Sequence, residues 1–239
     1  MSRTNHLDPL IDVFSEFHDR EISYVVPRKH DLLRADEVPK SDDVDIIIWD
    51  KDYENAIEIC RNYEFSTTAT FPERIQTLAS RAIAEPRTAI DLLIDSPKQV
   101  LTLIFSDSIN PYNHRNDKLY SDDLMLDIRN GLAYRSPMDG TRIRVDPAVD
   151  KGLFERRREV EKVFVPSPSD ELAHIISHSI FDKKGEFNRY YTNRCQKLFE
   201  QVEDNAQLDK TFIELLKLIF LMPIRLFTLQ LNMRNSINS

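Results

Sequence analysis

A short acidic segment that runs into an apolar stretch constrains the fold of this chain more than any other feature. Asp43 and Asp45 lie two residues apart and lead into Ile46, Ile47 and Ile48. β-Branched residues favour strands, and side chains alternate across a strand, so this spacing places both carboxylates on one face. The isoleucines predict a buried strand that holds the two carboxylates in a fixed position.

Two carboxylates at this spacing indicate a metal site. Like charges a few ångströms apart repel each other unless a cation lies between them. Mg²⁺ prefers oxygen ligands and often binds one or two carboxylates together with the phosphates of a substrate. Asp43 and Asp45 therefore predict a site for a metal ion and a triphosphate. The alternative is that they are solvent-exposed residues at the start of an ordinary strand.

Composition restricts the class of protein further. The chain has 239 residues, of which 41% are hydrophobic and 30% charged. This length suits one large domain, or a medium domain with a helical appendage. A net charge of −8 argues against broad, non-specific binding of nucleic acid. The four glycines are too dispersed for a P-loop or a dinucleotide-binding fingerprint.

Cysteine content and hydropathy predict a cytoplasmic protein. Cys60 and Cys195 are too few and too far apart for a disulfide framework or a zinc cluster. Residues 1–8 lack the apolar core of a signal peptide. The apolar stretch 212–231 contains charged residues, which are costly inside a membrane, so we expect a core or interface helix rather than a transmembrane segment. Peripheral membrane contact by an amphipathic helix is the alternative.

Local patterns predict an α/β (α+β) domain over residues 1–165, with a mixed sheet flanked by helices, and a helical domain over residues 166–239. The Pro-Ser-Pro-Ser run at 166–169 marks the boundary, with a helix starting near Ser169. Helices are expected at 8–20, from 50 onward and at 75–83; strands at 22–26, 43–49, 89–94, 124–128, 132–135 and 141–145; a strand or short helix at 100–105; and loops at 27–40 and 107–123.

Four segments carry a resemblance to a known family. They are the strand ending in arginine at 24–28, the acidic strand 41–48 with the helical pattern 53–59, the second acidic strand 124–132, and the helical pattern 171–178 followed by Lys183, Lys184 and Tyr190. Together they resemble the nucleotidyltransferase-fold superfamily, and within it the uncharacterised nucleotidyltransferase family associated with polysaccharide-related genes. LicD-type phosphotransferases are a near neighbour with a similar acidic strand.

The resemblance implies a metal-dependent nucleotidyltransferase. Asp43, Asp45 and Asp127 would be the catalytic carboxylates and the ligands of Mg²⁺, and Asp127 could also accept the proton of the acceptor hydroxyl. Arg28, Lys29 and Ser41 would contact the bound nucleotide, for which we expect ATP. The acceptor, a hydroxyl or a phosphate group, is not specified by any motif.

The chain departs from the superfamily at one point. Many members carry a Gly-Ser pair on a turn before the acidic strand, where it holds the triphosphate. Here no glycine stands in that region, and Ser41 is the only serine nearby. The alternative to an enzyme is therefore an inactive relative with a binding or regulatory role. A third option is a partner protein in a toxin–antitoxin-like pair, in which a small nucleotidyltransferase modifies a protein. The C-terminal helices are the candidate surface for a protein partner.

Some residues allow a plainer interpretation. Asp127 could be a surface residue of an edge strand. Arg28 could form a structural salt bridge instead of contacting phosphate. His174 and His178 are four residues apart on one helical face, so they could bind zinc, contact nucleotide or acceptor, or simply pack.

Overall fold

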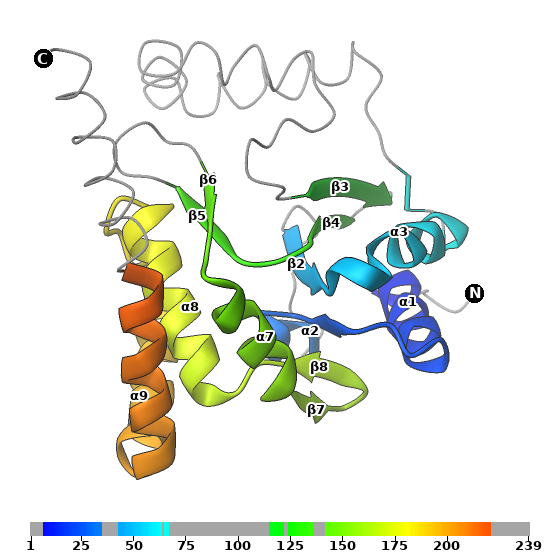
Figure 1. The fold of residues 1–239 in the computed structure, drawn as a ribbon. Helices are drawn as coiled ribbons and strands as arrows, with labels where there is room; N and C mark the ends of the chain where they lie inside the picture. The colour runs from blue at the N-terminus through cyan, green and yellow to red at the C-terminus, as the bar shows by residue number, and fades with distance from the viewer. Residues whose placement is uncertain are drawn as a thin grey trace, which may run out of the picture.

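The computed structural model describes residues 7–34, 43–63, 65–66, 115–121, 124–135 and 142–220. It confirms a mixed α/β fold (Figure 1). In chain order the elements are α1 (Asp8–Asp19), β1 (Tyr24–Val25), α2 (His30–Arg34), β2 (Asp43–Ile48), the 3₁₀ helix η1 (Asp50–Asp52), α3 (Tyr53–Asn62), β3 (Asn116–Ser121), β4 (Leu124–Arg129), β5 (Ala133–Arg135), β6 (Arg142–Arg144), α7 (Pro147–Glu155), β7 (Arg158–Val160), β8 (Val163–Val165), α8 (Pro168–Phe181), α9 (Arg189–Glu203) and a helix over residues 206–220.

A mixed sheet of four strands lies at the centre, in the order β1-β2-β4-β3. β2 and β4 are parallel, whereas β1 pairs with β2 and β3 pairs with β4 in antiparallel fashion. β5 with β6 and β7 with β8 form two separate antiparallel pairs. The mixed sheet predicted from the sequence is confirmed.

One face of the sheet packs against α1 and α3, which lie next to each other at the right of Figure 1. Val44, Ile46 and Ile48 alternate along β2 and all point into this first core. Phe14 and Phe17 of α1 enter the same core, since they lie three residues apart on the apolar face of that helix.

The opposite face contributes to a second core. Val25 and Ile47, directly paired on β1 and β2, belong to a cluster with side chains from α7, α8, α9 and the helix over residues 206–220. The C-terminal helices therefore pack on the same sheet face that carries Asp43 and Asp45, because these aspartates alternate in step with Ile47.

Two predicted loops contain regular structure. α2 lies within the expected loop 27–40, and β3 lies within the expected loop 107–123. Neither has a local signature. The leucines of α2 pack on the first core, and β3 is a polar edge strand in which Leu119 alone is buried. Tertiary contacts stabilise both elements, so local periodicity could not predict them.

The helix start near Ser169 is corrected slightly. α8 begins at Pro168, and Ser167 is the N-cap, whose hydroxyl accepts a hydrogen bond from the backbone N–H of Asp170 at 3.3 Å. Proline at the first helical position suits this start because its missing N–H would have no partner there.

Several expected elements lie outside the described residues: the helix at 75–83, the strand at 89–94 and the segment 100–105, together with Ser41 and residues 221–231. Among the described helices, none combines the length and apolar character needed to cross a membrane.

Candidate metal centre

Three carboxylates meet on one face of the central sheet. Asp45 of β2 is directly paired with Asp127 of β4, and Asp43 precedes Asp45 by two residues. Directly paired residues of neighbouring strands point to the same face. Ligand oxygens of the three side chains lie within 4.8 Å of one another. Within the part of the chain that the structure describes, no other group of three or more His, Cys, Asp or Glu side chains meets in this way.

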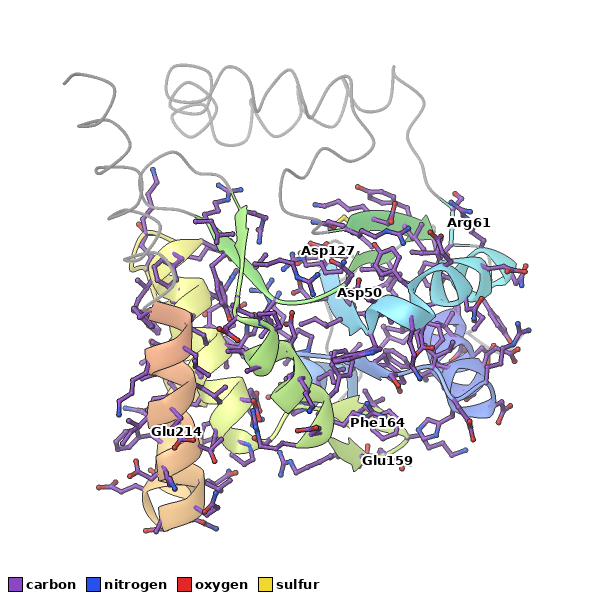
Figure 2. The ribbon with its side chains drawn as sticks, viewed as in Figure 1. Asp50, Arg61, Asp127, Glu159, Phe164 and Glu214 are labelled. Atoms are coloured by element: carbon purple, nitrogen blue, oxygen red, sulfur yellow. The ribbon has the colours of Figure 1, made fainter. Side chains whose placement is uncertain are left out.

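The cluster is recessed rather than solvent-exposed. Asp45 is 4% exposed and Asp127 is 3% exposed, while Asp43 is partly exposed. β4 lies between β2 and β3, so the interpretation of Asp127 as a surface residue of an edge strand is wrong. In the view of Figure 2, Asp127 lies beside the strands of the central sheet, whereas Glu159 and Glu214 lie toward the outer edge of the coloured ribbon.

Arg28 lies against this cluster and binds Asp45. Its Nε and Nη2 lie 2.6 Å and 2.5 Å from Asp45 Oδ2. Burial would raise the pKa of Asp45, but the positive charges of Arg28 and Arg129 outweigh this effect and hold the pKa well below its usual range. The Asp45 carboxylate is therefore ionised across the physiological pH range.

Two C-terminal helices hold the rest of the Arg28 guanidinium. Nη1 donates to the hydroxyl of Tyr191 on α9 at 2.7 Å and contacts Nε2 of His178 on α8. Nδ1 of His178 lies 2.9 Å from the carboxylate of Asp182, which can only accept a hydrogen bond. Nδ1 therefore carries the proton, and Nε2 is left as an acceptor for Arg28. Arg28 forms a structural ion pair that joins the sheet to α8 and α9.

The histidine pair does not form a zinc site with any third ligand among the described residues. Nδ1 of His174 is hydrogen-bonded to the hydroxyl of Tyr134 at 2.8 Å, and His178 is engaged by Arg28 and Asp182. Burial lowers the pKa of His174 well below its ordinary value, and the positive charge of Arg28 lowers it further. Both rings pack and hydrogen-bond as neutral groups.

Arg129 is a second arginine in the cluster, and the sequence analysis missed it. Its Nη2 lies 3.0 Å from Asp45 Oδ1 and contacts Asp127 Oδ2, while its Nε lies 3.2 Å from Asp127 Oδ1. Arg129 follows Asp127 by two residues on a strand, so alternation alone could have placed it on the same face. Lys118 of β3 is directly paired with Asp127. Alternation along a strand could not have indicated this position, because residues 107–123 were predicted as a loop.

Lys29, which the resemblance implies as a nucleotide contact, has an unusual backbone conformation. Lys29, between β1 and α2, has φ of 58°, in the left-handed region that favours glycine. Lys29 is therefore a left-handed residue other than glycine at the start of α2, where its carbonyl accepts hydrogen bonds from the backbone N–H groups of Leu32 and Leu33. Ser41 lies outside the described residues, so its predicted contact to nucleotide stays a prediction.

The donor set fits a hard divalent cation. All three candidate ligands offer carboxylate oxygens, which suit Mg²⁺ better than a thiophilic metal. Asp45 Oδ1 is buried and accepts no hydrogen bond among the described residues, although Arg129 lies close to it. Arg129 and Asp45 Oδ1 therefore form an ion pair, but the geometry is not that of a hydrogen bond. The lone pairs of Asp45 Oδ1 can point to a metal ion instead.

Comparisons with protein-family models, with curated proteins and with solved structures find no match for this chain. What the geometry defines is a mixed α/β protein with a recessed carboxylate cluster that could hold a metal ion.

Proposed function

We propose that this protein is a metal-dependent nucleotidyltransferase that moves a nucleotidyl group from an NTP to a hydroxyl or phosphate acceptor. One observation carries the proposal: Asp43, Asp45 and Asp127 come from two different strands and bring their ligand oxygens within 4.8 Å. The nucleotidyltransferase-like fold, ATP as donor, the cytoplasmic location and a protein partner on the C-terminal helices belong to the same proposal.

The reaction is an in-line displacement at the α-phosphorus. The acceptor oxygen forms a bond to this phosphorus, the bond to the bridging oxygen on the β side breaks, and pyrophosphate leaves. Mg²⁺ held by the three aspartates would neutralise charge on the phosphates and on the leaving oxygen. Asp127 is the candidate to accept the proton of the acceptor, because a positioned carboxylate within reach of the attacking oxygen can act as a base.

The positive charges of the site have separate roles in this proposal. Lys29 follows Arg28 directly before α2 and is the candidate contact for a phosphate oxygen. Arg28 keeps Asp45 ionised and oriented for metal binding through its two contacts to Oδ2.

Calorimetric titration with ATP, GTP, CTP and UTP, each with and without Mg²⁺, tests the proposal. Wild-type protein should bind at least one nucleotide only in the presence of Mg²⁺, and Asp43→Asn should abolish that binding. Asp12→Asn is the matched control, since Asp12 is an exposed residue of α1 and loses the same charge. A folded wild-type protein that binds none of the four nucleotides rules the proposal out.

The second candidate function is that of a catalytically inactive relative with a binding or regulatory role. One observation favours it: Arg28 and Arg129 already pair with Asp45 and Asp127, so two of the three carboxylates have a cationic partner without any metal. The titration separates the two functions, because an inactive relative of this kind has no need of Mg²⁺ at the cluster.

A further inference from the structure

The guanidinium of Arg129 lies between two of the three carboxylates. Nη2 of Arg129 is 3.0 Å from Asp45 Oδ1 and also contacts Asp127 Oδ2, so a single nitrogen bridges β2 and β4. Its Nε approaches the other Asp127 oxygen at 3.2 Å. The side chain therefore supplies a positive charge where a cation shared by Asp45 and Asp127 would sit.

The two arginines of the cluster differ in how firmly they are held. Arg28 uses every guanidinium nitrogen and reaches Tyr191 and His178 as well as Asp45. Within the described part of the chain, the side-chain hydrogen bonds and ion pairs of Arg129 all go to Asp45 and Asp127. Arg129 can therefore leave these carboxylates without breaking any other such contact.

A metal ion and Arg129 compete for the same oxygens. Asp45 Oδ1 is buried without a hydrogen bond, so it is the oxygen most ready to accept a metal. A divalent ion bound there would lie beside a guanidinium of like charge, and the two cations would repel strongly at a site so poor in solvent. Three carboxylates and two guanidinium groups leave one net negative charge, which a single divalent ion would turn into a net positive one.

We infer that Arg129 is a binding residue for the phosphate chain of the substrate, and that it moves from the carboxylates to a phosphate when metal and nucleotide arrive together. A triphosphate is the anion that suits this exchange, because its oxygens pair with a guanidinium in the same bidentate way as a carboxylate. The inference rests on the proposed function and specifies how its site binds substrate.

If Arg129 moves from the carboxylates to a phosphate, the affinity for metal and the affinity for nucleotide depend on each other. Nucleotide draws Arg129 away and so strengthens metal binding; by thermodynamic reciprocity, metal strengthens nucleotide binding by the same factor. The factor is expected to be about 5- to 150-fold, the usual range for coupled sites.

Calorimetry on the full chain measures this factor directly. Mg²⁺ alone, ATP alone in the presence of a chelator, and Mg²⁺ in the presence of saturating ATP are titrated into wild type, Arg129→Gln and Arg20→Gln. Arg20→Gln is the matched control because Arg20 is exposed and pairs with Glu16 on α1, away from the cluster. The nucleotide that binds best replaces ATP if another is preferred.

Wild type and Arg20→Gln should bind Mg²⁺ weakly alone and several-fold more tightly with nucleotide. Arg129→Gln should bind Mg²⁺ alone more tightly than wild type, bind nucleotide more weakly, and lose most of the coupling. Circular dichroism establishes that the variant is folded. If it is not, Arg129→Lys serves instead, since lysine keeps the charge without the bidentate fork and should reduce the coupling.

Two results overturn the inference. One is wild-type protein that binds Mg²⁺ equally well with and without nucleotide. The other is a folded Arg129 variant whose coupling equals that of wild type. The first result also contradicts the proposed function, because by reciprocity nucleotide binding would then be independent of Mg²⁺. The second result removes the inference alone: Mg²⁺-dependent nucleotide binding that is lost in Asp43→Asn would leave the proposed function standing. If wild-type protein binds no nucleotide, both the inference about Arg129 and the proposed function are ruled out.

Discussion

Arg28 and Asp45 form an ion pair in which Nε and Nη2 of the arginine lie 2.6 Å and 2.5 Å from one carboxylate oxygen. Both residues are buried, and the arginine extends the contact to α8 and α9 through His178 and Tyr191. The pair therefore holds the candidate metal centre and the C-terminal helices in one arrangement.

Replacing Arg28 with glutamine should destabilise the protein by about 3–5 kcal/mol, because Asp45 would keep a buried charge that only Arg129 then compensates. Chemical denaturation measures the free energy of unfolding. Arg20→Gln removes a charge from an exposed pair and should cost less than about 1 kcal/mol. Equal effects of the two substitutions would contradict the structural role of Arg28.

Asp43→Asn and Asp45→Asn should separate binding from stability. Both substitutions should abolish Mg²⁺-dependent nucleotide binding, since each removes one carboxylate of the cluster. Asp45→Asn removes the buried negative charge that Arg28 and Arg129 share, so it should lower the free energy of unfolding by about 3 kcal/mol or more. Asp43 is partly exposed, so Asp43→Asn should lower it by less than about 1 kcal/mol. Denaturant titrations of wild type and the two variants, in the absence of metal, measure these differences in the free energy of unfolding. A fully stable Asp45→Asn protein would be incompatible with the buried ion pairs described above.

Acidification below about pH 6.5 should destabilise the protein through His174. Its folded-state pKa is depressed by burial and by nearby positive charge, whereas the pKa in the unfolded chain is about 6.5. The unfolded state therefore binds more protons in this window, and the free energy of unfolding falls as pH drops, by at most about 1.4 kcal/mol per pH unit for one histidine. His178, whose pKa is also lowered by burial, contributes with the same sign.

His174→Gln isolates this contribution. Glutamine can still hydrogen-bond the Tyr134 hydroxyl but does not titrate, so unfolding free energies measured between pH 7.5 and 5.5 should fall less steeply than in wild type. Asp150 titrates in the same window with the opposite sign, because burial raises its pKa to about 6, but it is present in both proteins and cancels in the comparison. Identical slopes would show that His174 is not buried as a neutral ring.

Gly131→Ala should cost about 1–3 kcal/mol through overpacking. A Cβ at this position would lie 2.5 Å from Arg144 Nη2 and 2.5 Å from Asp150 Oδ2, which themselves form an ion pair of 2.9 Å. The alanine methyl group must push these side chains apart. In an Arg144→Ala background the same substitution should cost less, which a double-mutant cycle of thermal or denaturant unfolding can measure. Additive effects would mean that Arg144 moves aside freely.

The sequence predicted the parts of the site that depend on alternation within a strand. Asp43 and Asp45 were identified because acidic residues beside an apolar β-branched run are readable without knowledge of the fold, whereas the role of Asp127 was implied by the family resemblance. The structure brings the three together. The arginine that pairs with two of these aspartates was harder to predict from the sequence. Arg129 lay within reach of the same alternation argument, but nothing local indicated that its guanidinium would neutralise two of the aspartates.

Contacts between distant segments account for what the sequence could not predict. His178 meets Arg28 across 150 residues, and Tyr191 meets it across 163, so no spacing rule links them. The left-handed backbone at Lys29 had no local signal either, because a lysine adopts this conformation only where the surrounding structure stabilises it.

The second core contains residues from both sides of the predicted boundary near residue 166. Val25 and Ile47 share that core with α7, α8 and α9, and Arg28 reaches across to the last two of these helices. The backbone amides of β2 and α8 should consequently exchange with solvent deuterium through one common opening, as a single cooperative unit. A fragment that ended at residue 165 would expose Ile47 to water and leave the guanidinium of Arg28 half-satisfied, so the sheet depends on the helices that follow it.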